Sequence, residues 1–134
     1  MKLRVVVDSN IYVSAIVFGG VPKSLLTLAE LGQFEICTSA TIRQEVERTL
    51  KQKFQWPHEH IDFACSPLWA IAHNVDAEPF LAIADDPDDN RILECAVAAR
   101  AHVIVTGDDD LLRLKNFEGI EILKPRPFLN RYEP

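Results

Sequence analysis

The segment from Asp85 to Asp110 constrains the chain most, because it carries more negative charge than it can neutralise internally. It reads DDPDDNRILECAVAARAHVIVTGDDD and holds eight Asp or Glu residues but only two Arg residues. The acids gather mainly at its two ends, on either side of an apolar centre. Something outside the segment must therefore neutralise these carboxylates when the chain folds.

The centre of this segment predicts a helix followed by a buried strand. Apolar residues recur at the spacing of one helical stripe, namely Ile92, Leu93, Ala96 and Val97. With the alanines around them, they favour a helix from about residue 90 to 100, and Asp88 or Asp89 is expected to cap its start. The β-branched run at 103–106 is typical of a strand that is covered on both faces.

This pattern places two distant aspartates on one edge of the fold. In a parallel α/β layer, a helix begins at the carboxyl edge of the sheet and returns to the amino edge. The start of the helix and the loop after the next strand therefore share a rim. We expect Asp89 and Asp108 to lie together on that rim, although 19 positions separate them.

The rest of the chain continues the alternation of strands and helices. The expected strands are 3–7, 34–37 and 120–123. One helix is expected from Pro22 to about Leu31, and a second after a capping box at Thr41-x-x-Gln44. A third is expected over 58–73, interrupted or kinked near Ser66-Pro67. A short helix at 111–114 and a closing turn at 127–129 complete the chain. This order predicts a three-layer α/β/α fold with a parallel sheet, as a single domain over residues 1–134.

Composition limits the possible functions. The chain has 134 residues and a formal net charge of −6, which argues against a bulk nucleic-acid binder, although residues 1–60 are mildly basic. No apolar stretch is long enough to span a bilayer, so we expect no membrane association and a cytoplasmic location. The three cysteines are widely spaced, which favours buried, reduced thiols.

Acidic residues at the ends of the strands and helices predict a metal site. Asp8 follows the first strand, and we expect it to join Asp89, Asp108 and one glutamate at the carboxyl edge. Periodicity leaves Glu45 and Glu47 equally possible, because each lies roughly 100° from the centre of the apolar stripe of its helix. Clustered carboxylates favour a hard divalent cation, Mg²⁺ or Mn²⁺, and such a metal suits phosphodiester hydrolysis.

Three polar residues on the helix after residue 41 suggest contact with RNA. Gln44, Arg48 and Lys51 lie on its outer face, where they could follow a sugar-phosphate backbone. A solvated helix face explains the same pattern.

Four motifs together resemble the PIN-domain family, especially the VapC-like toxins of bacterial toxin–antitoxin pairs. They are VVVDSN at 5–10, Glu45 followed by Val46 and Leu50, DPDDN at 86–90, and VTGDDDL at 105–111. The likeness covers nearly the whole chain. It implies a five-stranded parallel sheet between helices, Mg²⁺- or Mn²⁺-dependent endoribonuclease activity on single-stranded or structured RNA, a cognate antitoxin and a possible homodimer.

The resemblance also assigns roles to individual residues. It implies that the catalytic and metal-binding acids are Asp8, Glu45, Asp89 and Asp108, and it selects Glu45 over Glu47. Asn10 and Thr106 are implied as hydrogen-bonding support, and Asp110 matches as an accessory acid.

Two other kinds of protein share parts of this pattern. A receiver-like phosphoacceptor domain has a similar layout and a Lys-Pro pair like Lys124-Pro125, but it would need a paired acid after the first strand and a lone acceptor aspartate in mid-chain. A non-catalytic PIN-like module that binds RNA or protein is the other alternative. The four candidate carboxylates argue against it.

Overall fold

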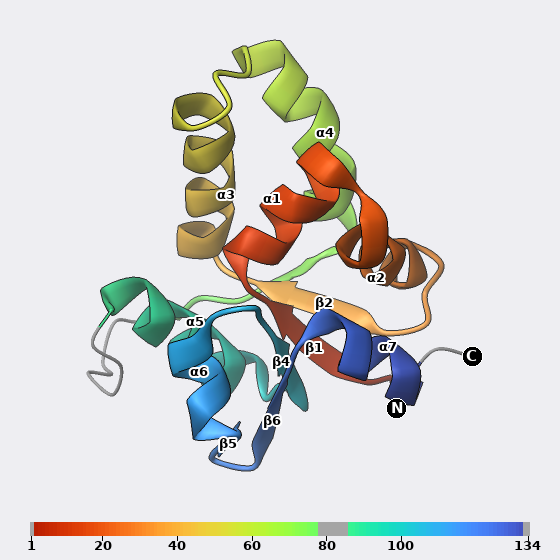
Figure 1. Ribbon diagram of the computed structural model, residues 1–134, viewed down its shortest axis with the longest axis vertical. Coiled ribbons are helices and arrows are strands. Elements are labelled where there is room, and N and C mark those ends of the chain that lie inside the picture. Colours follow the sequence, from red (N-terminus) through yellow and green to blue (C-terminus); the bar gives the residue numbers. More distant parts are fainter. Residues whose placement is uncertain (1, 78–85, 133–134) are drawn as a thin grey trace.

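A six-stranded sheet forms the centre of the protein in a computed structural model that describes residues 2–77 and 86–132 (Figure 1). The strands are β1 (Arg4–Val7), β2 (Glu35–Thr38), β3 (His73–Asn74), β4 (Val103–Val105), β5 (Asn116–Phe117) and β6 (Ile120–Leu123). Their order is β3-β2-β1-β4-β6-β5, and only β5 runs antiparallel to its neighbour. The predicted five-stranded parallel sheet is confirmed, with β5 added at one edge.

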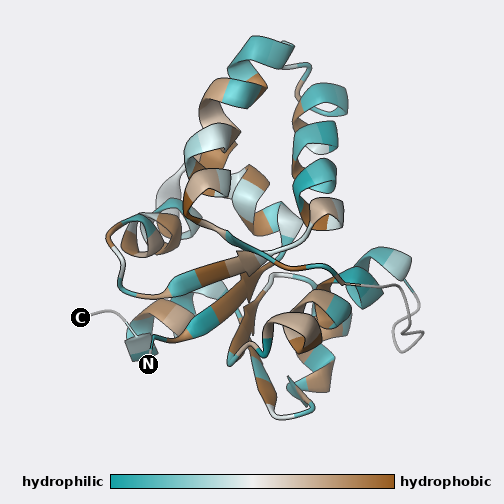
Figure 2. Cartoon of the chain, turned by 180° about the vertical axis from the view of Figure 1, so that it is seen from behind, coloured by the Kyte–Doolittle hydropathy of each residue, from teal (hydrophilic) through white to brown (hydrophobic). Residues whose placement is uncertain are grey.

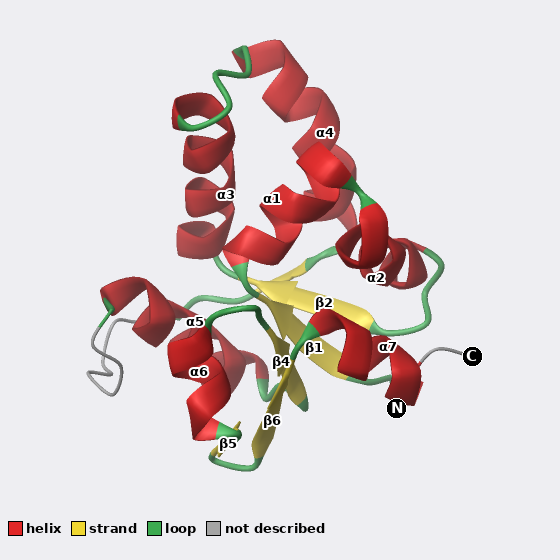
Figure 3. Ribbon diagram, viewed as in Figure 1, coloured by secondary structure: helices red, strands yellow, loops and turns green. Residues whose placement is uncertain are grey.

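Helices flank this sheet (Figure 3). They are α1 (Ser9–Phe18), α2 (Gly20–Glu30), α3 (Ala40–Gln52), α4 (His58–Ile71), α5 (Pro87–Ala99), α6 (Asp109–Leu114) and α7 (Pro125–Tyr132). α5 packs against β1 and β2, and α6 packs against β6. α3 and α4 contact each other and form an arm that projects away from the sheet (Figure 1).

The chain changes direction across the sheet between β1 and β4. β2 lies on one side of β1 and β4 on the other, and Val7 pairs with Val105 at the ends of these parallel strands. Ligands of open α/β sheets bind outside the carboxyl ends of the strands at such a switch point. The residues that follow Val7 and Val105 therefore occupy the favoured position for a functional site.

Several helices begin earlier than predicted, with α2 starting at Gly20 and α6 at Asp109, and two predicted helix caps differ from the structure. The prediction of a capping box at Thr41-x-x-Gln44 is wrong, because α3 begins at Ala40 and the Ser39 side chain caps it. The Ser39 hydroxyl accepts from the Ile42 N–H at 3.3 Å. α5 also begins earlier, with Pro87 in its first turn, where a missing N–H costs nothing. Asp86 caps it by accepting from the Asp88 N–H at 2.9 Å, so the expected cap at Asp88 or Asp89 was wrong. Asp85 lies outside the described residues.

Other elements were missed or continue further than predicted. α1, β3 and β5 were not predicted, and the expected closing turn at 127–129 belongs to α7. Of the predicted interruption or kink near Pro67, the interruption is wrong, because α4 is a single helix that contains this proline. Because proline has no N–H, Pro67 cannot donate the helical hydrogen bond to the Phe63 carbonyl. Phe63 is 84% exposed. Solvent can reach that stretch of the helix.

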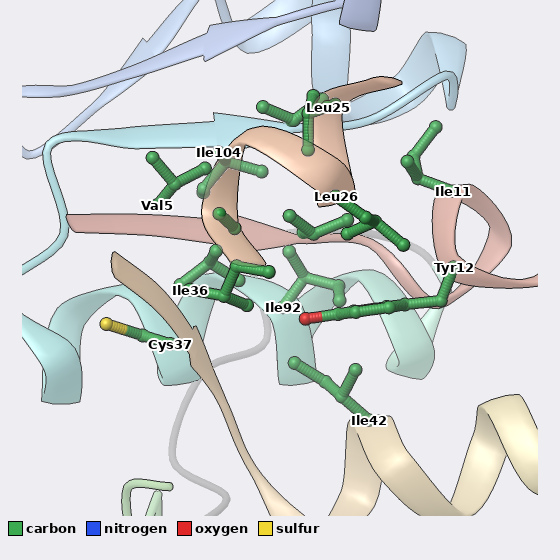
Figure 4. Packing of buried hydrophobic residues seen from close by; sticks show 14 of the residues in the cluster. Val5, Ile11, Tyr12, Leu25, Leu26, Ile36, Cys37, Ile42, Ile92 and Ile104 are labelled. Carbon is green, nitrogen blue, oxygen red and sulfur yellow. The ribbon is translucent and has the colours of Figure 1, made fainter. Parts of the chain in front are cut away.

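The core joins the sheet to the helices on both sides. Figure 4 shows Tyr12 of α1 extending between Ile42 of α3 and Ile92 of α5, and all three residues are buried. The side of α3 away from the core is mostly hydrophilic (Figure 2). Cys37, Cys65 and Cys95 are buried and free, as predicted.

Within the described residues, no single helix has the length and apolarity needed to cross a membrane. α1 and α2 meet these criteria only as a pair, and they meet at 103°.

Candidate active site

Asp8 lies at the switch point, directly after β1. Its N–H donates to the Val105 carbonyl of β4 at 2.9 Å, which fixes the backbone between the two strands. Its side chain does not cap α1. Instead, Oδ2 accepts from the Thr106 hydroxyl at 2.7 Å, and Oδ1 lies 3.3 Å from the Ser9 hydroxyl that donates to it. The carboxylate is thus held in one orientation at the carboxyl edge.

Burial dominates the electrostatics of Asp8. The residue is 6% exposed, and burial raises the pKa of its carboxyl above the usual range. Hydrogen bonds from Thr106, the Asn10 backbone N–H and Ser9 oppose this rise in pKa, while the charge of Asp108 adds to it. The predicted support from Asn10 thus comes from its backbone, and that from Thr106 comes from its hydroxyl.

Three aspartates gather beside Asp8. Asp89, Asp108 and Asp110 each offer a carboxylate oxygen, and these oxygens lie within 4.8 Å of one another. Asp89 stands in the first turn of α5, whereas the other two come from the loop after β4 and the start of α6. Asp89 and Asp108 therefore lie close together, as predicted, although 19 positions separate them in the sequence. Asp110, which the family resemblance implies as an accessory acid, is exposed and lies within the same 4.8 Å.

Asp89 is the member of this group whose negative charge is most unfavourable. It is 6% exposed, and its Oδ2 is buried without a hydrogen-bond partner among the described residues. Burial, followed by the neighbouring Asp108 carboxylate, raises the pKa of Asp89 to about 7. A buried oxygen that lacks a donor is costly unless a cation or a proton reaches it.

Thr106 links the two halves of the site. Its hydroxyl donates to Asp8 and accepts from the Asp108 N–H at 3.0 Å. Asp108 Oδ2 in turn accepts from the Leu111 N–H at 3.0 Å and caps α6. One buried hydroxyl therefore orients the Asp8 carboxylate and anchors the backbone of Asp108.

Replacing this hydroxyl is expected to cost stability. In Thr106→Val, Asp8 loses a donor and the Asp108 N–H loses an acceptor, while the shape of the side chain is kept. We expect the free energy of unfolding to fall by about 1–3 kcal/mol, measured by urea denaturation. Thr106→Ser keeps the hydroxyl, so its free energy of unfolding is expected to fall much less. A loss in Thr106→Val no larger than that in Thr106→Ser would show that the two hydrogen bonds contribute no more to stability than the packing of the methyl group.

The structure separates the two glutamates that periodicity could not. Glu47 Oε2 accepts from the Trp69 indole N–H of α4 at 2.8 Å, so it faces the arm. Glu45 faces the acidic pocket. Burial first, and then the charges of Asp88 and Asp8, raise the pKa of Glu45 above its usual range. Of the two, only Glu45 is placed to act with Asp8.

An open cleft of about 560 Å³ leads to the carboxylates. It is lined by Asn10, Ile11, Gly107, Asp108, Asp109, Asp110 and Arg113. Arg113 was not singled out from the sequence, yet its guanidinium lies 2.8 Å from Asp110. The spacing of i and i+3 on a helix was the available signal. Because both side chains are at least half exposed, this ion pair adds little stability and can open to release either partner.

The residues predicted to contact RNA lie on the exposed part of α3. Gln44, Arg48 and Lys51 are all exposed. Arg48 is near enough to Glu45 to oppose the rise in its pKa. The structure thus brings Arg48 to the margin of the pocket.

The donor set fits a hard divalent cation. Every candidate ligand is a carboxylate oxygen, the type that Mg²⁺ and Mn²⁺ prefer. The Oδ2 of Asp89 is buried and has no hydrogen-bond partner in the part of the chain that the structure describes, so such an ion would satisfy it. The geometry places Asp89, Asp108 and Asp110 as the residues that could hold the ion, with Asp8 and Glu45 adjoining them.

These features define a class of α/β domains with an acidic pocket at the switch point of a mostly parallel sheet. The sequence matches the PIN domain over residues 4–110, so the chain belongs to the PIN-domain family. A chain in the crystal structure of VapBC2 from Rickettsia felis, bound to a DNA fragment from their promoter, has a similar fold, with a TM-score of 0.64. The two are 14% identical over 90% of this chain and 97% of the other. No curated protein matches the sequence.

Proposed function

We propose that this protein is a metal-dependent endoribonuclease. The observation that carries the proposal is the convergence of Asp89, Asp108 and Asp110 beside Asp8, with a buried carboxylate oxygen that lacks a partner among the described residues. Isolated acids cap helices and end strands in many proteins. Acids that meet in one pocket at such electrostatic cost are better explained by a bound cation.

The residues of the pocket would divide the work. Asp8, Asp89 and Asp108, with Asp110 beside them, would hold Mg²⁺ or Mn²⁺, which activates water and neutralises charge on a phosphoryl group when bound. Glu45 would accept a proton from the attacking water or orient it, because burial and neighbouring acids raise its pKa and make it a better base. Thr106 and Ser9 would hold Asp8 in position. The products would carry 5′-phosphate and 3′-hydroxyl ends.

We also propose that the protein is the toxin of a toxin–antitoxin pair. The similar structure is that of VapBC2 bound to promoter DNA, and this likeness supports a cognate partner protein for the present chain. The RNA substrate, single-stranded or structured, would be met in the cytoplasm. Gln44, Arg48 and Lys51 would contact its backbone from α3.

The direct test is RNA cleavage with and without metal. Purified protein is incubated with a labelled single-stranded RNA in Mg²⁺, in Mn²⁺ and in chelator. We expect cleavage only with metal, restored when metal is added back after chelation. Cleavage that persists in chelator at the same rate would contradict the proposal.

Glu45 and Glu47 form a matched pair for testing the site. Glu45→Gln is expected to lower kcat for RNA cleavage by about 100-fold or more, because it removes the base at the pocket. Glu47→Gln makes the same chemical change two residues away and should cleave nearly as wild type, because Glu47 instead accepts from Trp69. Equal loss in both variants would mean that helix α3 was perturbed and that Glu45 has no special role.

A further inference from the structure

The turn between α3 and α4 forms the far end of the arm (Figure 3). Aromatic side chains lie in and around this turn. Trp56 and His60 stack in parallel, with ring centroids 4.0 Å apart and planes 1° from parallel. Phe54 meets Phe18 edge-on at 5.9 Å, and the Lys53 ammonium lies 5.7 Å from the centre of the Phe54 ring. We call these five residues the tip cluster.

Much of the tip cluster is open to solvent. Phe18 is 74% exposed, and His60 and Lys53 are also exposed. Trp56 and Phe54 are half-buried and pack against the core. The indole covers one face of the His60 ring, so an incoming ring could extend the stack on the other face. Aromatic surface exposed at the end of a projecting arm has no evident role in stabilising the core.

The backbone holds these rings in place at a cost. Gln55, between Phe54 and Trp56, has a φ of 57°, in the left-handed region that non-glycine residues rarely adopt. The Trp56 N–H donates to the Leu50 carbonyl at 3.1 Å and closes the turn. Strained backbone of this kind tends to occur where function requires a particular arrangement of side chains.

The α3 side of the tip cluster is basic, although the chain as a whole is acidic. The whole protein has a net charge of −6, yet residues 48–58 contain Arg48, Lys51 and Lys53 and no acid, and the acids Glu59 and Asp62 lie on the α4 side. Cations next to flat aromatic rings suit a single nucleic-acid strand, whose phosphates meet the cations while its bases stack on the rings. An apolar protein surface would leave these cations without partners.

One face of α3 leads from Glu45, beside the acidic pocket, toward the tip cluster. Glu45, Arg48 and Gln52 lie at i, i+3 and i+7, along one face of α3. Eight residues from Glu45 to Lys53 span about 12 Å of helix. A strand whose phosphate sits in the pocket can therefore follow this face to the tip.

We propose that the tip cluster is a stacking platform for the bases of single-stranded RNA, with His60 on Trp56 as its central element. Bases flanking the cleaved phosphate stack on this pair, and Arg48, Lys51 and Lys53 contact the intervening phosphates. This inference rests on the proposed function and extends it from the reacting phosphate to the substrate on either side.

Binding without cleavage tests the platform separately from the chemistry. A short fluorescein-labelled single-stranded RNA is titrated with full-length protein in chelator, and anisotropy is measured. We expect His60→Ala and Trp56→Ala to weaken binding by about tenfold, and Trp56→Phe to keep most of it. His60→Ala changes an exposed side chain, so its result does not depend on the stability of the arm. Phe63→Ala, which removes another exposed aromatic ring of α4, should bind as wild type.

Two further measurements identify stacking as the cause. Trp56 and Trp69 are the only tryptophans in the chain. In Trp69→Phe, RNA should therefore quench fluorescence that comes from Trp56 alone. An abasic sugar-phosphate oligomer should bind more weakly than RNA and should not distinguish His60→Ala from wild type.

Unchanged RNA binding by both alanine variants overturns the platform and leaves a protein partner as the occupant of the tip. Equal effects of His60→Ala on RNA and on the abasic oligomer also overturn it, because the contact would then be with phosphate. Neither result bears on metal-dependent cleavage. Conversely, if no cleavage occurs with metal but the variants weaken binding, the nuclease proposal fails and the platform stands.

Discussion

Asp8→Asn is expected to lower the rate of metal-dependent RNA cleavage by about a thousandfold, because it removes a buried negative charge beside Asp89 and Asp108. The amide oxygen can still accept from the Thr106 hydroxyl, and only the longer hydrogen bond from Ser9, at 3.3 Å, loses its acceptor, so the fold should persist. Rates are measured under single-turnover conditions at saturating metal. Circular dichroism and thermal melting verify that the variant is folded.

Asp109→Asn is the matched control for this experiment. It makes the same change in charge and lies in the same cleft, but Asp109 is exposed and outside the group of three close carboxylates. We expect its cleavage rate to stay within a few-fold of wild type. A folded Asp8→Asn that cleaves as fast as Asp109→Asn would remove Asp8 from the site.

Asp89→Asn is expected to stabilise the metal-free protein at pH 8. The pKa of Asp89 is about 7 in the folded state, against roughly 3.9 in an unfolded chain. Between these values the folded state retains the proton that the unfolded state releases. Raising the pH from 4 to 7 therefore lowers the stability of the wild type, and the full cost persists above pH 7. Removing the carboxylate should raise the free energy of unfolding by about 1–3 kcal/mol at pH 8 and by almost nothing at pH 4.

Thermal melts in chelator at several pH values measure this difference. The gain at pH 8 corresponds to several degrees in Tm for a chain of this size. Mg²⁺ should raise the Tm of the wild type through preferential binding to the folded state, and Asp89→Asn should lose most of that rise. Asp88→Asn, on the exposed side of the same helical turn, serves as control. A marked drop in Tm for Asp89→Asn at pH 8 would mean that the carboxylate stabilises α5 and has no electrostatic cost.

The strand ends and their acids were predictable because the signals are local. Runs such as 103–106 are short, β-branched and followed by a loop, and the parallel topology then places Asp8, Asp89 and Asp108 on one rim. By contrast, α1 is apolar around most of its circumference, so it shows no stripe that would predict a helix. Prolines at 125 and 127 favour a turn, yet both fit the first turn of α7, where backbone N–H groups need no partner.

The choice between Glu45 and Glu47 depended on tertiary structure. The Trp69 side chain comes from another helix, 22 positions after Glu47, and no local pattern in α3 signals that contact. The cap of α3 was equally ambiguous, because Ser39 and Thr41 both carry a hydroxyl near the helix start. Only the position of the backbone at the end of β2 decides between them.

Within the described residues, neither edge of the central sheet offers a long free strand. β3 has only two residues at one edge, and the two-residue β5 runs antiparallel to β6 at the other. Edges this short give two copies of the protein little strand with which to join their sheets. Substitutions on helix surfaces are therefore expected to affect self-association more than substitutions in β3 or β5.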